Sequence, residues 1–217
     1  MSGIQQMLTG GTYKAPGPTT IGQAYGGGYY AGQIAVGGGG TATHYLIVAP
    51  KASGEAAKKW GTYGVTTGFT SVINGPTNSA GEAALGAAYQ AAKFCEDLNI
   101  GDYSDWYLPA KNELEVLYYF LKPGTELNDT SSGSNANAVS PEPVSQNYTG
   151  SSPARTSAGI GFRTGETNAF SDASSYWSST EVNNSYAWKQ EFVTGSQANN
   201  YGKDNNYYTR AVRRVPI

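Results

Sequence analysis

The sequence predicts an α+β fold, in which short strands open and close the chain and two helices lie between them. Two runs rich in β-branched and aromatic residues come first, two segments with helical periodicity follow, and three more strand-like runs end the chain. Glycine is frequent, with 29 residues, whereas charged residues make up 14%. Because aromatic residues still contribute 12%, we expect a folded chain with much irregular backbone.

The first elements are an arm and a hairpin. Residues 1–28 contain prolines and glycines without apolar periodicity, so they predict an extended arm, and residues 29–217 are expected to form the folded domain. Residues 29–36 and 43–49 then predict two strands joined by a glycine loop. That loop lacks the Gly-Lys-Ser/Thr ending of a phosphate-binding loop, and a strand follows it instead of a helix.

Two helices are expected in the middle of the chain. In residues 82–98, an apolar stripe occurs at helical spacing, formed by Leu85, Ala88, Ala92 and Cys95. The second helix is expected over residues 111–121, after Pro109 and before a Lys-Pro-Gly stop. Its inner face carries leucines, namely Leu114, Leu117 and Leu121.

The second half of the chain predicts long loops and then strands. Residues 125–175 are rich in Ser, Thr, Asn, Gly and Pro, and their scattered aromatic residues favour ordered loops. Strands are expected over residues 176–180, 186–193 and 208–215. The last of these can pair near the first strands, which would bring the two ends of the domain together.

Composition excludes several classes of function. A net charge of −2 offers no basic surface for nucleic acid, and no apolar stretch is long enough to cross a membrane. The first residues lack the pattern of a secretory signal. The single Cys95 and single His44 form no zinc cluster, and both are expected to be structural residues in apolar surroundings. We therefore expect no metal, no cofactor and no catalytic group.

Three motifs carry a resemblance to a known family. They are GDYSDWYLPAKNEL at 101–114, YWSSTE at 176–181 and RAVR at 210–213, with IGQAYGGG at 21–28 as an entry segment. In this order and spacing they resemble the C-type-lectin-like family of bacteria and phages typified by the Lcl C-terminal domain. The opening MSGIQQML resembles the start of small phage tail proteins.

The resemblance implies a C-type lectin fold, with a small twisted antiparallel sheet, two helices and a face rich in loops. It places Trp106 and Trp177 in the core. Arginines near the end of the chain are expected to form ion pairs with acids such as Glu113, Glu115 or Glu191; these arginines are Arg210, Arg213 and Arg214. The chain lacks the carboxylate ligands with which animal C-type lectins hold calcium, so calcium-dependent sugar binding is not expected.

The strongest binding signal lies in residues 181–208, where Asn pairs alternate with aromatic residues. Asn offers hydrogen-bond donors and acceptors, and Tyr offers a flat amphipathic surface at a small cost in entropy. For any single Asn, a turn between strands is the better interpretation, but three Asn pairs interleaved with Tyr favour a binding surface. The expected receptor-binding residues are Asn183, Asn184, Tyr186, Trp188, Asn199, Asn200, Tyr201, Lys203, Asp204, Asn205, Asn206 and Tyr207.

These observations predict a non-enzymatic phage virion protein of the tail tip or a tail fibre. Its arm would attach to other tail proteins, and its domain would bind a glycan or protein on the host surface. A homo-oligomer, specifically a trimer, would add avidity to weak sites. The alternatives are a structural or decorating component of the virion, a bacterial surface adhesin, and an enzyme that acts on surface glycans.

Overall fold

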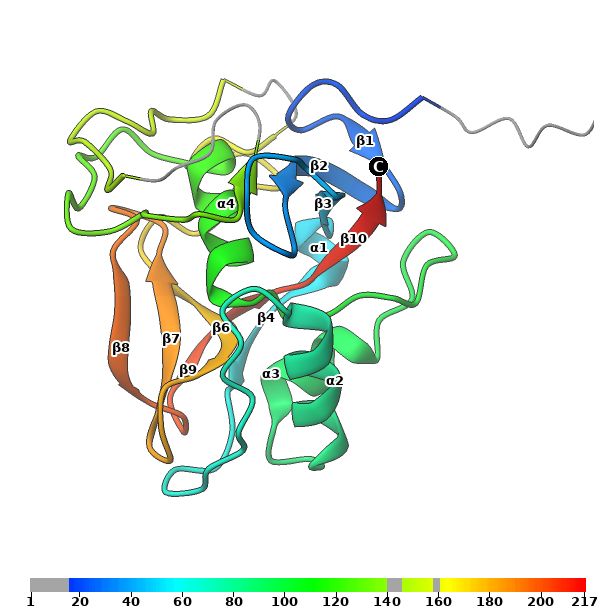
Figure 1. The fold of residues 1–217 in the computed structure, drawn as a ribbon, viewed down its shortest axis with the longest axis vertical. Coiled ribbons are helices and arrows are strands. Elements are labelled where there is room, and N and C mark those ends of the chain that lie inside the picture. Colours follow the sequence, from blue (N-terminus) through cyan, green and yellow to red (C-terminus); the bar gives the residue numbers. More distant parts are fainter. Residues whose placement is uncertain (1–15, 140–145, 158–160) are drawn as a thin grey trace, which may run out of the picture.

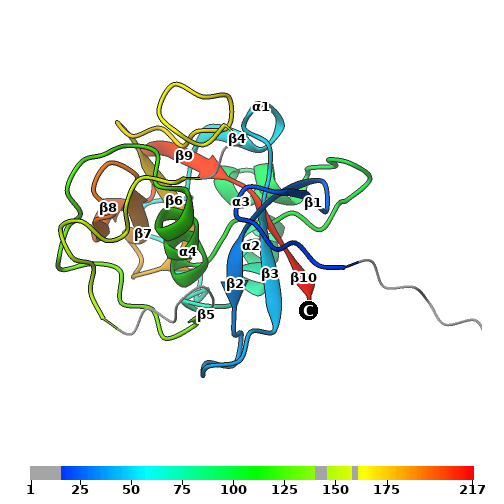
Figure 2. The same cartoon turned by 90° about the horizontal axis from the view of Figure 1, so that it is seen from above.

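Two mainly antiparallel sheets and a few short helices make up the fold, which confirms the expected α+β class (Figure 1). The computed structural model describes residues 16–139, 146–157 and 161–217. The last strands of the chain pass from one sheet to the other, and Figure 2 shows the two sheets from above. Among the described residues, no helix is long and apolar enough to span a membrane.

The first sheet joins the two ends of the domain. Its order is β1-β2-β3-β10, with β5 paired to β2. The strands are β1 (Ala24–Tyr25), β2 (Gly28–Ile34), β3 (His44–Val48), β5 (Ala138–Val139) and β10 (Val212–Pro216). The predicted hairpin is confirmed as β2 and β3, and the predicted return of the chain end is confirmed by the antiparallel pairing of β10 with β3.

The segment before β2 is part of this sheet. β1 pairs with β2, and the Gly22 amide donates a hydrogen bond of 2.7 Å to the Tyr30 carbonyl. The Arg213 guanidinium donates to the Gly26 carbonyl at 3.0 Å. Residues 20–28 of the expected arm therefore pack on the domain, whereas residues 1–15 lie outside the described residues.

The second sheet has the order β4-β9-β6-β7-β8. Its strands are β4 (Glu55–Lys59), β6 (Ser175–Glu181), β7 (Tyr186–Glu191), β8 (Gln197–Gly202) and β9 (Asn206–Arg210). The two edge strands, β4 and β8, are not expected from the sequence. The sequence also predicts one strand over residues 208–215, whereas the chain changes sheets at Ala211, between β9 and β10. The Ala211 backbone bonds Ala49 and Gly54 at this crossing, at 3.0 Å each.

The helices correct one prediction and confirm another. They are α1 (Lys51–Gly54), α2 (Gly75–Ala84), α3 (Gln90–Glu96) and α4 (Lys111–Leu121). The expected helix over residues 82–98 is wrong, because Gly86 adopts φ +108° and separates α2 from α3. Leu85 and Ala88 fall in this break and are exposed, while Ala92 and Cys95 are buried as expected. The expected helix over residues 111–121 is confirmed as α4, with its three leucines buried.

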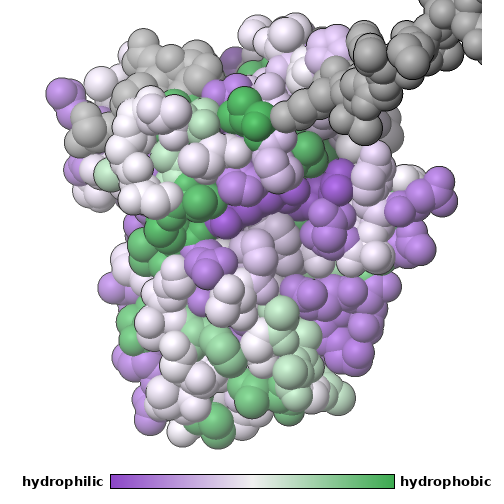
Figure 3. Space-filling model, turned by 45° about the vertical axis from the view of Figure 1, so that its right-hand side comes forward, coloured by the Kyte–Doolittle hydropathy of each residue, from purple (hydrophilic) through white to green (hydrophobic). Residues whose placement is uncertain are grey.

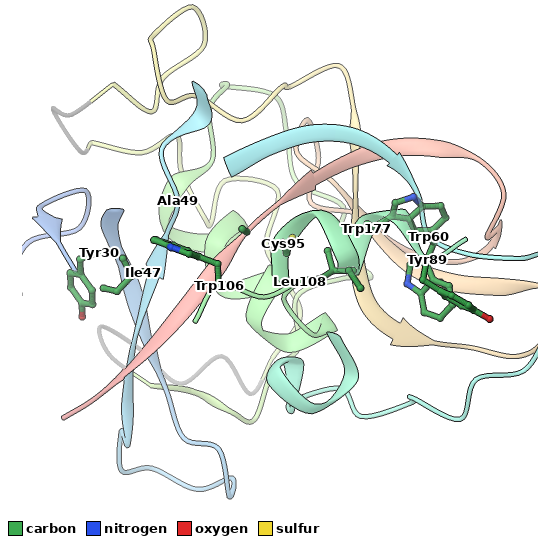
Figure 4. Packing of buried hydrophobic residues seen from close by; sticks show 13 residues of the cluster. Tyr30, Ile47, Ala49, Trp60, Tyr89, Cys95, Trp106, Leu108 and Trp177 are labelled. Carbon is green, nitrogen blue, oxygen red and sulfur yellow. The ribbon is translucent and has the colours of Figure 1, made fainter. Parts of the chain in front are cut away.

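Two hydrophobic clusters fill the space around the second sheet. One joins α3 to both sheets through Trp60, Trp106 and Trp177, and Figure 4 shows its side chains in a row from Tyr30 to Tyr89. The other lies under α4 and takes Phe162 and Phe170 from the long loops, which are therefore ordered by packing. Trp106 and Trp177 are fully buried.

The three arginines of the last strands form ion pairs, as expected, but only Arg214 has one of the expected acids as its partner. The Arg214 Nε atom lies 2.7 Å from the Glu113 Oε1 atom. Arg213 contacts Asp105 at 2.7 Å, and Arg210 contacts Glu55 at 2.9 Å, so these two arginines use acids that the sequence analysis did not name. The other two expected acids have different partners.

Candidate functional site

The structure divides the predicted binding residues between the two faces of the second sheet. Side chains alternate along a strand, so Tyr186 and Trp188 of β7 share one face, while Ala187 and Lys189 share the other. Tyr201 of β8 pairs with Ala187 and therefore lies on the second face. The predicted single surface does not exist as one patch.

Tyr201 and Tyr207 pack on the first hydrophobic cluster, on the α3 side of the sheet. The Lys189 Nζ atom lies 3.8 Å from the centre of the Tyr201 ring, and the Tyr207 ring lies 4.8 Å from that of Trp177. Lys189 is buried and also donates to Ser175 at 2.7 Å. These contacts make the two tyrosines partly buried packing residues as well as surface residues.

Lys203 corrects the predicted binding set, because its side chain is fully buried. Its ammonium group pairs with the Glu181 carboxylate and donates to the Val65 carbonyl at 2.8 Å. Glu181 also accepts from the amides of Thr67 and Gly68, at 2.7 Å each. A lysine held in this way ties the loop after β4 to the sheet and cannot contact a receptor.

The predicted asparagines either stabilise turns through side-chain hydrogen bonds or are exposed to solvent. The Asn183 Oδ1 atom accepts from the amides of Ser185 at 2.8 Å and Tyr186 at 2.9 Å. The Asn205 Nδ2 atom donates to the Gly202 carbonyl at 2.9 Å. Further predicted residues are exposed, namely Asn184, Asn199, Asn200, Asp204 and Asn206.

A small pocket lies beside Trp188, on the α4 side of the sheet. Its volume is about 190 Å³. Its lining brings together α4, two loop segments, β7 and β8, and consists of Lys111, Ser131, Ser132, Gly133, Ser134, Asn147, Trp188 and Gln197. The Lys111 Nζ atom lies 4.8 Å from the centre of the Trp188 ring. We call this site the Trp188 pocket.

Hydrogen bonds from backbone amides hold the walls of the Trp188 pocket in place. The Lys111 amide, at the start of α4, donates to the Thr180 hydroxyl at 3.0 Å. The Ser132 hydroxyl accepts from the Gln197 amide at 3.0 Å, and the Ser132 carbonyl accepts from the Tyr148 amide at 2.8 Å. Both loop segments are thereby fixed to the sheet and to each other.

Gly133 allows the loop to lie directly on the Tyr148 ring. Its φ is +93°, and a Cβ atom at this position would lie 2.0 Å from the Tyr148 ring. No other residue type fits without movement of the ring or the loop. Both wall segments depend on this contact.

Comparison with known proteins identifies the family. The model of the Lcl C-terminal domain matches residues 59–213, which is most of the chain and includes α4, Trp188 and Gln197. The chain belongs to the Lcl C-terminal domain family. No curated protein matches its sequence.

One solved structure is similar to this Lcl C-terminal domain in part. It is a fimbrial protein from Bacteroides ovatus, with 16% sequence identity and a TM-score of 0.43. The match covers 77% of this chain and 35% of that one, so the chain spans about a third of the length of the fimbrial protein.

Two adjoining hollows lie on the α3 side of the domain. They have volumes of about 350 and 410 Å³ and share Gln90 in their walls. The exposed Tyr63 lines the second hollow and contacts the Tyr186 ring at 6.4 Å between centres. Figure 3 shows one face of the molecule, on which apolar residues form separate patches among polar ones.

Titratable groups in the described part of the chain form no cluster of three or more His, Cys, Asp or Glu side chains that could hold a metal ion. Burial raises the pKa of the Cys95 thiol well above its usual value, which keeps it protonated. His44 is half-buried in β3, its Nδ1 atom lies 3.0 Å from the Thr43 hydroxyl, and burial together with Arg214 lowers its pKa.

Sequence reasoning found Trp188 but missed most of the pocket around it. Lys111, the serines of residues 131–134, Asn147 and Gln197 had no local pattern that set them apart. Ser and Asn are so abundant that those lining the pocket do not stand out among many turn formers. The useful signal was the isolated Tyr148 within a polar stretch, which marks where that loop enters the core.

Proposed function

We propose that this domain is a non-catalytic recognition module that binds a saccharide of a host cell surface at the Trp188 pocket. The observation that carries the proposal is the half-buried Trp188 ring, surrounded by hydroxyl, amide and ammonium groups. An aromatic ring can stack on the apolar face of a sugar, while these polar groups bond its hydroxyls.

The proposal includes a C-type lectin fold. In its support, the terminal strands β2, β3 and β10 lie together, and a long loop region covers one side of the second sheet. The Trp188 pocket lies where this loop region meets the sheet, and loops held on a rigid scaffold commonly carry binding residues.

The test compares Trp188→Ala with Tyr63→Ala on an array of purified bacterial surface polysaccharides. Tyr63 is 53% exposed, is also aromatic and lies outside the Trp188 pocket, so its variant is a matched control. We expect Trp188→Ala to weaken binding at least tenfold, since truncating an aromatic anchor of a binding site costs about 2 kcal/mol or more and about 1.4 kcal/mol is tenfold in affinity. We expect Tyr63→Ala to leave binding unchanged. Equal binding by both variants would overturn the proposed site.

We further propose that the domain works in a phage tail tip or tail fibre, as a trimer attached through residues near its N-terminus. This setting is supported by the sequence resemblance and by β1, an edge strand of the first sheet that follows the N-terminal segment. Removing residues 1–15 should release the protein from assembled particles and leave its polysaccharide binding intact. Particles that carry Trp188→Ala and still adsorb normally would instead indicate a structural or decorating role.

A further inference from the structure

A buried carboxylate stands behind the Trp188 pocket. Glu115 lies one helical turn after Lys111 on α4, on the same side of the helix, and is fully buried. Its Oε2 atom accepts from Asn135 Nδ2 at 2.5 Å, and its Oε1 atom accepts from the Tyr148 hydroxyl at 2.9 Å. Asn135 follows the serine segment of the pocket, and Tyr148 follows Asn147. Glu115 therefore joins both wall segments to α4.

The direction of these bonds matters. A carboxylate accepts both, but a protonated carboxyl group must donate one hydrogen bond itself. Asn135 Nδ2 can only donate, so the Tyr148 hydroxyl would have to accept. The hydrogen of the Tyr148 hydroxyl would then point toward Gln190 Nε2. This nitrogen is itself a donor and already donates to the Tyr148 oxygen at 3.4 Å. Turning the Gln190 amide would lose its bond to the Gly195 carbonyl at 3.2 Å.

We propose that Glu115 is a positioning residue for the Trp188 pocket, and that its ionised carboxylate holds the two wall segments in their binding arrangement. Protonation reverses the hydrogen bond to Tyr148 and turns the Tyr148 hydrogen toward Gln190, which weakens one of the two tethers and loosens the wall that Gly133 and Asn147 share with Tyr148. Saccharide binding then weakens as the solution becomes acidic, a consequence that rests on the proposed function.

Burial and the groups around Glu115 place its protonation near neutral pH. Burial raises the pKa of Glu115 to about 7, while the bonds from Asn135 and Tyr148 and the charge of Lys111 act in the opposite direction. Lys111 is the charged group that faces it in the described part of the chain, and Tyr148 and Tyr118, which pack together, are the nearby phenols. Burial lowers the pKa of Lys111, and Glu115 opposes that shift.

The first experiment needs no saccharide. Trp60, Trp106 and Trp177 are fully buried, so acrylamide quenching of tryptophan fluorescence reports mainly on Trp188, with Trp188→Phe as background. We expect the extent of Trp188 quenching to change with pH, with a midpoint near pH 7. In Glu115→Gln, quenching should no longer depend on pH in this range. Glu96→Gln is the control, because burial also raises the pKa of Glu96, which lies on α3. It should keep the change.

Tyr148→Phe gives a second variant that removes one tether without altering charge, and it should reduce the amplitude of the change. A pH-independent quenching signal between pH 6 and 8 in the wild-type protein would overturn the proposal. So would an unaltered pH response in Glu115→Gln or Tyr148→Phe.

The second experiment repeats the polysaccharide array at pH 6 and pH 8. If only the ionised form binds, affinity should fall about tenfold at pH 6, because the competent fraction falls by that factor. Binding that is equal at both values would overturn the inference while leaving the proposed function in place. An empty array together with the expected quenching change would overturn the proposed function and leave the positioning role of Glu115 in place.

Discussion

The two faces of the second sheet use the same residue types for different purposes. On the α3 side, Tyr201 and Tyr207 rest on Trp177, and the buried Lys189 lies between the rings. On the α4 side, Trp188 meets a single cation, Lys111, at the rim of a pocket. An aromatic residue on a strand thus packs in the core or lines a surface pocket according to what covers it.

The charged groups divide in the same way. Behind the α3 face, Lys203 and Glu181 form a closed pair with backbone partners. Behind the α4 face, Glu115 has neutral partners and Lys111 one turn away. The first arrangement fixes a loop, whereas the second leaves a carboxyl group that can titrate.

The largest difference is expected between two tryptophans. Trp177→Ala removes a fully buried ring and should lower the free energy of unfolding by about 4–5 kcal/mol. Trp188→Ala removes a partly exposed ring and should cost less than about 1 kcal/mol. Urea unfolding followed by circular dichroism measures both. Similar losses would mean that Trp188 is a core residue.

The next effect concerns the closed ion pair. Lys203→Met leaves Glu181 buried without its cation and should cost about 4 kcal/mol, because an unpaired buried charge is expensive. The same unfolding experiment measures it, and adding Glu181→Gln should recover part of the loss.

The pH dependence of this pair has a defined sign. Lys203 and the two backbone amides lower the pKa of Glu181 in the folded protein, and they outweigh the opposing effect of burial, its largest single influence. The stabilisation is therefore present above the unfolded value, near 4.5, and is lost as the pH falls through the lower folded value. If Lys203→Met lowered the free energy of unfolding by the same amount at pH 2 and pH 7, this account would be contradicted.

Glu115 should show the opposite pH dependence. Burial raises its folded pKa to about 7, so its contribution to stability is complete below 4.5 and falls as the pH rises through 7. The loss amounts to about 3 kcal/mol at most. Unfolding measured from pH 4 to pH 8 should show this slope in the wild-type protein and a flatter curve in Glu115→Gln. An identical slope in the variant would assign the effect to another group.

A small loss of stability is expected at Tyr201. Tyr201→Ala should cost about 1 kcal/mol, through lost packing and the lost contact with Lys189. Polysaccharide binding at the Trp188 pocket should not change, since Tyr201 lies on the other face of the sheet. A binding loss as large as that of Trp188→Ala would show that the two faces act together.

Elements with strong local signals were predictable. α4 begins after Pro109, carries leucines at helical spacing and ends before Pro123, so its limits agree with the sequence. The sequence predicts one helix over residues 82–98, which joins the last residues of α2 to α3, because alanines continue the helical spacing across Gly86; the start of α2 at Gly75 is not predicted. β4 and β8 have weak strand composition and depend on pairing with β9 and β7.

The candidate site was predictable to the level of one residue. Trp188 stands out as a large aromatic residue in an alternating strand, but alternation does not say which face is open. Its partners come from residues 111, 131–134, 147 and 197, which are brought together by bonds from Glu115, Ser132 and Tyr148. Contacts across such sequence distances leave no periodic pattern.

Local sequence alone specifies the α+β class, the hairpin of β2 and β3, α4, and a polar surface built from Asn, Ser and Tyr, because spacing and turn chemistry act over a few residues. Packing decides the change of sheet at Ala211, the burial of Lys203, and which side of β7 stays open. These outcomes depend on which distant segments cover each strand, and that coverage is settled only when the whole chain has folded.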